Sequence, residues 1–285
     1  MIFEELKKIV DSKQQEGLSE LYIRNLLKEH AQMYVLNFIS THEKYNKKFI
    51  FTGGTCLRHI YGLDRLSEDL DFDYIHDFDI SLFKAELQDY FVKRYQYRDI
   101  QILLKSRGRR IECKFPVLKK LGLAEENESD FLIVKLELSK IPTKEFTVVR
   151  TPQNKFGFSF ILMHYDLPSL FAGKLHAIFT RRRFTGSDNR KTIKGRDYYD
   201  LIWFLEKNII PHLPKLSAQL GKEITPRILE TELDKKVDEI SSHYLSDLES
   251  DLIPFISNHD VVVFFRKTFK DEYLKNKNYL CTTKN

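Results

Sequence analysis

The chain has 285 residues, of which 42% are hydrophobic and 31% are charged, a balance typical of globular proteins and unlike that of disordered or fibrous ones. The net charge of +5 is mild, and the first residues, MIFEELKKIVDSK, lack the apolar core of a signal peptide. No stretch approaches the ~18 apolar residues of a membrane span, so we expect a cytoplasmic protein without a membrane partner. Three widely spaced cysteines without a CxxC pair argue against a disulfide framework and a zinc ribbon.

The first third of the chain predicts a helix, a strand, a tight turn and a second strand. Ser19 is placed to cap an amphipathic helix that continues to Ile39 with a 3.6-residue period. The β-prone run 48–52 enters a Gly-Gly turn and a short helix, LRHIYG. Residues 69–74 then alternate strictly between acidic and apolar side chains, which indicates a strand with all its carboxylates on one face.

The rest of the chain changes character near Pro168. Before it we expect a helix over 79–95 and further strands, which bring the total to about seven, near 99–104, 110–117, 131–138, 146–150 and 158–163. After it the pattern is helical, over 168–181, 197–207, 226–248, 249–258 and 259–275. We therefore predict an α+β fold, with a mixed-sheet core over 1–165 and a helical bundle domain over 166–285. The segment SDNRKTIKG, between Gly186 and Gly195, is predicted to be a mobile loop.

The acidic strand has the chemistry of a metal site. Asp69 and Asp71, at positions i and i+2, project side by side and offer the oxygen ligands that a hard divalent cation prefers. We expect Mg²⁺ there, with Mn²⁺ as the alternative. Gly53, Gly54 and Thr55 form a bare turn at a helix N-terminus, where backbone N–H groups can approach the phosphates of a nucleotide.

Two other known motifs, the EF-hand and the Walker A loop, fit the sequence less well. An EF-hand would need glycine at the position of Tyr74 and glutamate at that of Ile80. Gly173-Lys174 resembles the end of a Walker A loop, but Leu175 stands where serine or threonine is required. A solvated acidic strand at a sheet edge remains the structural alternative.

The run FTGGTCLRHIYGLDRLSEDLDFD resembles the GG(T/S)…DxD signature of the nucleotidyltransferase superfamily, specifically its AbiEii/AbiGii toxin group. LPSLFAGKLHAIFTRR and KGRDYYDLIWFL are similar to two downstream motifs of that group, so the resemblance covers roughly residues 30–207. It implies a nucleotidyltransferase-type sheet and an enzyme that uses a nucleoside triphosphate and releases pyrophosphate. It also implies a toxin-like role with a separate antitoxin partner. Some members of the group add nucleotides to the 3′ end of tRNA.

Carried over by position, the resemblance assigns Asp69 and Asp71 as metal ligands and adds Lys174 and Asp197 as catalytic residues. Lys174 and Arg181 are seven residues apart on one helix face, where they could hold a triphosphate; a lysine extending from an apolar flank is the alternative for Lys174. Asp197 opens the next helix, so N-terminal capping is an equal interpretation of it. We expect Asp200 to face solvent or to pair with Arg196.

A third carboxylate is expected from a neighbouring strand. In IVKLELS, alternation places Lys135, Glu137 and Ser139 on one face, and we favour Glu137 over Asp73 as the third metal ligand, because a charge among apolar neighbours should have a partner. Arg65, between the glycine turn and the carboxylates, is assigned to phosphate binding. Arg58 could do the same, although single residues here, His59 among them, more often lie on a helix surface.

Basic residues concentrate between Lys174 and Arg196, where eight of them stand against Asp188 alone, a net charge of +7. Such a segment beside a carboxylate cluster suits an enzyme that handles polyanions, although it could also be a solvated charged loop. We therefore expect RNA, with tRNA favoured, as the acceptor of the nucleotide. The alternatives are an enzyme that nucleotidylates protein hydroxyl groups, and a nucleotide- or RNA-binding module without catalysis.

Overall fold

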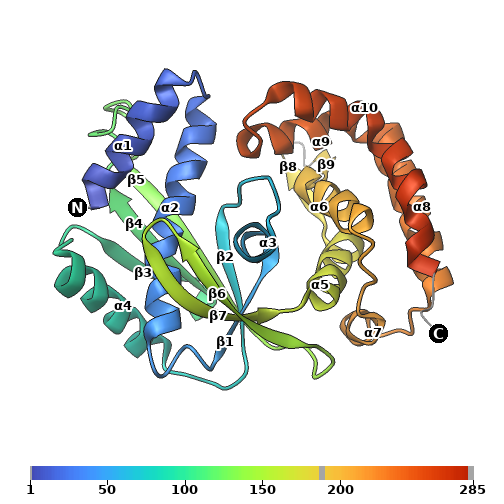
Figure 1. The fold of residues 1–285 in the computed structure, drawn as a ribbon, viewed down its shortest axis with the longest axis horizontal. Helices are drawn as coiled ribbons and strands as arrows, with labels where there is room; N and C mark the ends of the chain where they lie inside the picture. Colours follow the sequence, from blue (N-terminus) through green and yellow to red (C-terminus); the bar gives the residue numbers. More distant parts are fainter. Residues whose placement is uncertain (1, 186–189, 282–285) are drawn as a thin grey trace. The chain divides into compact units, whose positions relative to one another are not determined.

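The computed structural model describes residues 2–185 and 190–281, and the chain forms two compact units (Figure 1). The first unit comprises Met1–Ile141 and Val148–His164. The second comprises Tyr165–Asn285 together with the short segment Pro142–Thr147.

A seven-stranded mixed sheet forms the centre of the first unit, which confirms the predicted α+β fold. Its strands lie in the order β3-β4-β5-β2-β1-β7-β6. The acidic strand β2 pairs in parallel with β5 and antiparallel with β1, so it is central in the sheet and is no exposed edge. The strands are β1 (Phe49–Thr52), β2 (Asp69–Tyr74), β3 (Gln101–Lys105), β4 (Arg110–Pro116), β5 (Phe131–Lys140), β6 (Val148–Lys155) and β7 (Phe158–Tyr165).

Helices α2 (Glu20–Thr41) and α4 (Ile80–Tyr95) pack with aromatic side chains against one face of this sheet. The rings of Phe49 and Phe72 are 5.9 Å apart, and Phe83 of α4 meets Phe49 edge to face at 5.5 Å. Since Phe72 alternates with the aspartates along β2, burying it turns the aspartates to the opposite face. The packing of the core therefore orients the carboxylates.

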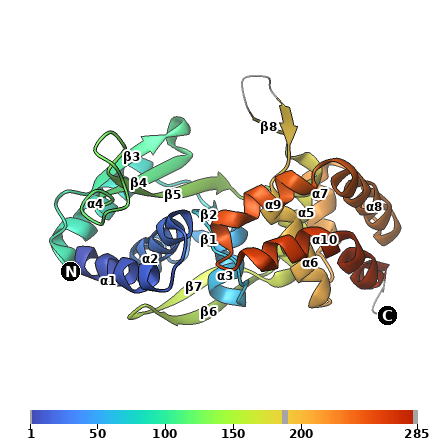
Figure 2. The ribbon, with the colours of Figure 1, turned by 90° about the horizontal axis from the view of Figure 1, so that it is seen from above.

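Local capping chemistry sets the starts of these helices. The Ser19 hydroxyl accepts from the backbone N–H of Tyr22, and the Asp79 carboxylate accepts from two N–H groups at the start of α4. Helix α1 (Ile2–Gln15), which we did not predict, packs beside α2 by burying Ile2, Leu6 and Val10, and Figure 2 shows the two together. The short helix α3 (Gly53–Tyr61) follows β1 directly.

Helices dominate the second unit (Figure 2). Phe171 of α5 stacks on Phe204 of α6 with ring centroids 4.4 Å apart. Gly195 opens α6 where a Cβ would lie 2.8 Å from the Cα of Leu248, so only glycine lets α6 approach α9 this closely. The helices are α5 (Leu167–Thr180), α6 (Gly195–Glu206), α7 (Leu213–Leu220), α8 (Pro226–His243), α9 (Leu245–Leu252) and α10 (His259–Asn276).

In the second unit the structure differs from the sequence-based predictions in its helices and in the predicted loop. The helix predicted over 226–248 breaks at Tyr244, and α7 was not predicted. Part of the predicted mobile loop is strand β9 (Arg190–Thr192), which pairs with β8 (Arg183–Thr185), while residues 187–189 of that loop lie outside the described residues. None of the helices in the described part of the chain is both long and apolar enough to cross a membrane.

Candidate active site

The side chains of Asp69, Asp71 and Asp73 lie on one face of β2, as the alternation predicted, because Leu70 and Phe72 are buried on the other. On β5 the buried positions 132, 134, 136 and 138 likewise alternate with partly exposed ones. Asp71 is directly opposite Glu137 in the β2–β5 register, and Asp69 is opposite Lys135. We call this side of β2 and β5 the carboxylate face.

The glycine turn packs directly against the carboxylate face. Gly53 has a φ of +74°, and a Cβ on it would lie 2.0 Å from Oδ2 of Asp71, so the Asp71 side chain occupies the space that any other residue would need. The Thr55 hydroxyl donates to the carbonyl oxygen of Asp69. The turn and β2 are thus tied together at two points, one a close approach and one a hydrogen bond.

Arg65 supports this turn from inside the protein. It is 2% exposed, its Nη1 donates to the carbonyl of Leu66 at 2.9 Å, and a Cβ on Gly54 would come within 2.9 Å of its Nη2. The structure therefore places Arg65 beneath the glycine turn. Its assignment to phosphate binding stays a prediction, although its burial favours a role in holding the backbone.

Two residues of α3, His59 and Arg58, lie in the protein differently from the helix surface that we expected, and His59 is buried while Arg58 is partly buried. His59 is 3% exposed with neither ring nitrogen hydrogen-bonded, and burial, reinforced by Lys155 and Arg58, lowers its pKa to about 3. His59 is therefore neutral at any physiological pH. Arg58 pairs with the buried Glu29 at 3.1 Å, which gives its charge a structural partner.

Glu137, the favoured third ligand, is engaged by a cation. Nε of Arg110 on β4 donates to Oε1 of Glu137 at 2.5 Å, and this bond raises the pKa of Arg110. Within residues 2–185 and 190–281, no three His, Cys, Asp or Glu side chains are grouped so that they could hold a metal ion by themselves. The three-carboxylate arrangement with Glu137 therefore stays a prediction, as does the choice between Glu137 and Asp73.

The Asp69–Asp71 pair nevertheless fits a hard divalent cation. Oδ1 of Asp69 is buried and has no hydrogen-bond partner among the described residues, and Nζ of Lys135 lies 4.0 Å from it. A buried carboxylate oxygen without a partner is costly, and a bound cation would remove that cost. Mg²⁺ is usually held by one or two carboxylates together with water and substrate phosphates, so two aspartates are sufficient protein ligands.

A second cluster of charges lies in the second unit, on α5 and α6. Nζ of Lys174 is 2.9 Å from Oδ1 of Asp197 and 2.7 Å from Oδ2 of Asp200, and the Arg181 guanidinium also pairs with Asp197. Both aspartates are buried, at 2% and 0% exposure. Of the two expectations for Asp200, exposure to solvent was wrong, because α6 turns its side chain inward to Lys174, while pairing with Arg196 stays a prediction.

The electrostatics of this cluster depend on Asp197. Burial alone would raise its pKa, but the charges of Lys174, Arg181 and Lys194 outweigh that effect and hold the pKa at about 2. The capping interpretation is wrong, since Lys194 is the N-cap of α6 and Asp197 lies within the first turn. Because Lys174 already has two carboxylate partners, its contact with a triphosphate, like that of Arg181, stays a prediction.

Four basic residues of the segment from Lys174 to Arg196 pair with carboxylates of the same unit. Besides the pairs just described, Lys191 lies 2.6 Å from Glu239 and Arg196 lies 3.2 Å from Asp251. Lys194 differs, because its ammonium group makes no hydrogen bond or ion pair with any other described residue. In the sequence, Lys194 is one of the eight basic residues of the segment and opens the motif KGRDYYDLIWFL.

Replacing Gly53 tests the close approach to Asp71. Gly53→Ala and Gly62→Ala should each lose about 1–2 kcal/mol in unfolding free energy, because both positions have a left-handed backbone, with φ of +74° and +76°. Only the Gly53 variant must also displace Asp71, since nothing lies within 4 Å of a Cβ on Gly62. We expect Mn²⁺ binding, measured by paramagnetic resonance in the presence of a nucleoside triphosphate, to weaken in the first variant alone. Equal binding in both would contradict the coupling of turn and carboxylate.

The buried charge cluster predicts a pH dependence of stability. Because the pKa of Asp197 is about 2 in the folded chain against 3.8 for a free side chain, its contribution is present above pH 4 and is lost as the pH falls toward 2. This lowering of the Asp197 pKa on folding corresponds to about 2 kcal/mol of unfolding free energy. Denaturant titrations at several pH values should show a smaller acid loss in Asp197→Asn than in the wild type.

The matched control is Asp238→Asn, which removes an exposed aspartate paired with Lys270. It should leave the acid loss of stability unchanged. If Asp197→Asn and the wild type lost the same stability on acidification, the carboxylate of Asp197 would not be held ionised by its neighbours.

Comparisons with known proteins identify the family. The model of the family described as "Nucleotidyl transferase AbiEii toxin, Type IV TA system" matches residues 38–268. The JHP933 protein from Helicobacter pylori is similar in structure, with 18% identity, a TM-score of 0.48 and coverage of 91% of this chain and 95% of that one. A candidate nucleotidyltransferase from H. pylori is similar too, with 16% identity, a TM-score of 0.48 and coverage of 90% of this chain and 98% of that one. No curated protein matches the sequence. Since the family model spans most of the chain, the protein belongs to the AbiEii family of nucleotidyltransferase toxins of type IV toxin–antitoxin systems.

Proposed function

We propose that this nucleotidyltransferase transfers a nucleoside monophosphate from a nucleoside triphosphate to RNA, with tRNA the favoured acceptor, in a Mg²⁺-dependent reaction. The observation that carries the proposal is the packing of Gly53 against Asp71 beside Asp69, whose buried Oδ1 has no hydrogen-bond partner. This arrangement brings a carboxylate pair and a glycine turn to the same place, which is what nucleotidyl transfer requires.

Asp69 and Asp71 would hold the cation, and Mn²⁺ could replace Mg²⁺ on the same oxygen ligands. When bound, the metal neutralises charge on the phosphoryl groups and aligns the attacking hydroxyl with the leaving pyrophosphate. In the transfer, an acceptor oxygen forms a bond to the α-phosphorus, the bond from that phosphorus to the pyrophosphate oxygen breaks, and the hydroxyl proton is released to solvent. The aspartates act by position and charge, since their strand is fixed on both sides by β1 and β5.

The N-terminus of α3 supplies the second requirement, a place for phosphates. Thr52 is the N-cap of α3 and its side chain makes no capping hydrogen bond, so the first N–H groups of the helix lack that partner. Gly53 and Gly54 place no side chain of their own over these groups, and the positive end of the helix dipole favours an anion there. We assign Gly53, Gly54 and Thr55 to positioning the triphosphate, because Thr55 also links this turn to β2.

RNA is the acceptor that the charge of the second unit favours. Lys194 has no ion-pair partner among the described residues, and the exposed Arg182 lies two residues after the end of α5. A polyanionic acceptor would be attracted to such groups, whereas a protein acceptor need not be. We place the reaction in the cytoplasm, where nucleoside triphosphates and tRNA are found, and expect a separate antitoxin to restrain it, as the family implies.

The decisive experiment identifies both substrates at once. The protein is incubated with each of the four α-³²P-labelled nucleoside triphosphates and Mg²⁺, with total RNA or with an RNA-depleted lysate as acceptor. We expect label in RNA, released pyrophosphate, and loss of both on chelation of the metal. Label in the protein fraction instead would favour the protein-modifying alternative, and binding of triphosphate without labelling of either would favour a non-catalytic module.

Asp69→Asn and Asp71→Asn should each lower turnover at least ~10²-fold, because preorganised charge at a phosphoryl-transfer site is worth several kcal/mol. Thermal unfolding should change little, since both side chains lie on the partly exposed face of β2. Asp77→Asn, which removes a 79% exposed carboxylate paired with Lys140, is the matched control and should retain turnover. Wild-type turnover in Asp69→Asn or Asp71→Asn would show that the site lies elsewhere.

A further inference from the structure

The hairpin that joins β3 to β4 in the first unit ends in a basic tip (Figure 2). Residues 105–109, KSRGR, which we call the basic tip, contain three cations and no carboxylate, and Lys105, Arg107 and Arg109 are all exposed. The side chains of Lys105 and Arg107 make no hydrogen bond or ion pair with any other residue that the structure describes. The Arg109 side chain donates to the carbonyl of Ser106 at 3.5 Å, within the tip itself. The basic tip is therefore a positive surface without a carboxylate partner among the described residues.

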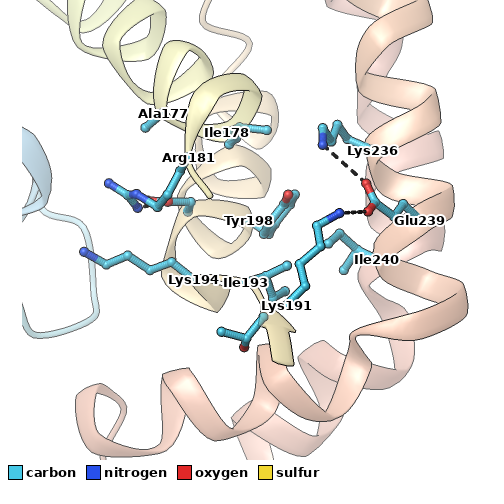
Figure 3. A pocket seen from close by; sticks show the side chains of 12 residues that line it. Ala177, Ile178, Arg181, Lys191, Ile193, Lys194, Tyr198, Lys236, Glu239 and Ile240 are labelled. Carbon is cyan, nitrogen blue, oxygen red and sulfur yellow. Dashed lines mark hydrogen bonds and ion pairs between the residues drawn. The ribbon is translucent and has the colours of Figure 1, made fainter. Parts of the chain in front are cut away.

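Several other basic residues of the chain are not available in this way. Arg110, which follows the basic tip directly, pairs with Glu137. In the second unit, Figure 3 shows Lys191 and Lys236 reaching the same carboxylate, that of Glu239, at 2.6 Å and 3.3 Å. An anion from outside the chain would have to break such ion pairs, whereas it can meet the basic tip without displacing a carboxylate.

The register of the sheet connects the basic tip to the carboxylate face. Lys105 is opposite Arg110 in the β3–β4 pair. Arg110 is in turn opposite Glu137, which is opposite Asp71. Residues that are directly opposite each other in neighbouring strands share a face of the sheet, so these four form one row, negative at β2 and β5 and positive at β4 and β3. Since adjacent strands are about 4.8 Å apart, Lys105 lies about 14 Å from Asp71 along the row.

The backbone of the basic tip has a conformation that most residues avoid. Ser106 and Arg107 have φ of +52° and +56°, and Gly108 follows with +83°. Left-handed backbones in residues other than glycine persist only where the surrounding structure fixes them, and they cluster at functional sites. Here the carbonyl of Arg109 accepts from the backbone N–H of Leu138 at 2.8 Å, which ties the tip to β5. The cations are therefore presented from a defined backbone.

The strand order separates the basic tip from the proposed triphosphate site. The glycine turn follows β1 on one side of β2, and the hairpin lies beyond β5 on the other side. In an in-line displacement the attacking and leaving oxygens are on opposite sides of the phosphorus. An acceptor that approaches from the hairpin would therefore bring its hydroxyl to the side opposite the pyrophosphate.

We propose that the basic tip binds backbone phosphates of the RNA acceptor, upstream of the 3′ hydroxyl that reacts at Asp69 and Asp71. The inference rests on the proposed function, in taking RNA as the acceptor and these aspartates as the metal site. Stacked nucleotides follow one another at about 3.4 Å, so about four of them span the distance of about 14 Å from Asp71 to Lys105. Phosphates are attracted to the tip and repelled by the carboxylates of β2, so the charge of the row favours an RNA backbone over β3 and β4, with only the reacting end at the metal site.

Removing the two unpaired cations should weaken RNA binding and leave the fold intact. In the double variant Lys105→Met, Arg107→Asn, log K for a fluorescein-labelled single-stranded RNA should fall. Its slope against log salt, measured by anisotropy without triphosphate between about 50 and 200 mM, should become shallower by about 1.4, or about 0.7 for each lost contact. Thermal unfolding should change little, because asparagine tolerates the left-handed backbone of residue 107.

The matched control is the double variant Lys120→Met, Arg98→Asn. It removes the same two charges at the opposite end of β3 and β4, from exposed side chains that also lack ion pairs with any described residue. RNA binding and its salt slope should stay as in the wild type. An equal loss in both double variants would mean only a general effect of charge and would overturn the proposal.

Steady-state labelling of RNA separates the acceptor from the triphosphate. In the Lys105→Met, Arg107→Asn variant, KM for RNA should rise, whereas kcat and KM for the triphosphate should not change, because the tip holds the acceptor away from the reacting atoms. With a dinucleotide acceptor, too short to reach the tip, the variant should equal the wild type. A raised KM for the triphosphate with unchanged RNA binding would assign the tip to the nucleotide and overturn the proposal.

Failure of this inference can be told apart from failure of the proposed function. If the wild type labels RNA and the Lys105→Met, Arg107→Asn variant binds and labels it equally well, the basic tip is rejected and the proposed function stands. If the wild type labels no RNA, the proposed function is rejected, and with it the acceptor that the tip is proposed to hold.

Discussion

The candidate site depends on one steric constraint, the contact between the backbone of Gly53 and the side chain of Asp71. An oxygen of Asp71 occupies the volume where a Cβ would stand, so the turn can have no side chain and the aspartate has a fixed place. The Thr55 hydroxyl links the turn to β2, and the buried Arg65 packs beneath Gly54. The uncapped N-terminus of α3 and the carboxylate face are therefore parts of one rigid element. Precise positioning of a phosphate and a metal ion requires such rigidity.

The two units use acidic residues in opposite ways. On the carboxylate face an aspartate oxygen is left without a hydrogen-bond partner, while in the second unit Asp197 and Asp200 are buried and surrounded by cations. The first arrangement leaves capacity for a cation from outside the chain. The second neutralises Lys174 and Arg181, whereas the Lys194 ammonium makes no ion pair with any residue that the structure describes.

Sequence periodicity predicted the elements whose burial alternates regularly. The period-two pattern of residues 69–74 and the caps at Ser19 and Asp79 were sufficient because each depends on residues close in sequence. The environments of Arg65 and Asp200 could not be predicted in the same way. Arg65 is buried in a segment without periodicity, and Asp200 is paired with a lysine 26 positions away on another helix. Charged residues are buried only with partners, and those partners are brought together by tertiary packing, which no local pattern reports.

With only two aspartates as proposed protein ligands, the site depends on other ligands to bind a metal ion. Among the described residues, no three potential ligands are grouped to form a cage, and Glu137 is held by Arg110. On the proposed assignment, the remaining ligands must be water and the phosphates of the nucleotide, as is usual for Mg²⁺. Metal and triphosphate then bind with mutual dependence, because each supplies charge that the other needs. Glu137 could bind the metal ion only after its ion pair with Arg110 is broken. The stability of that ion pair would therefore determine whether a third carboxylate joins the site.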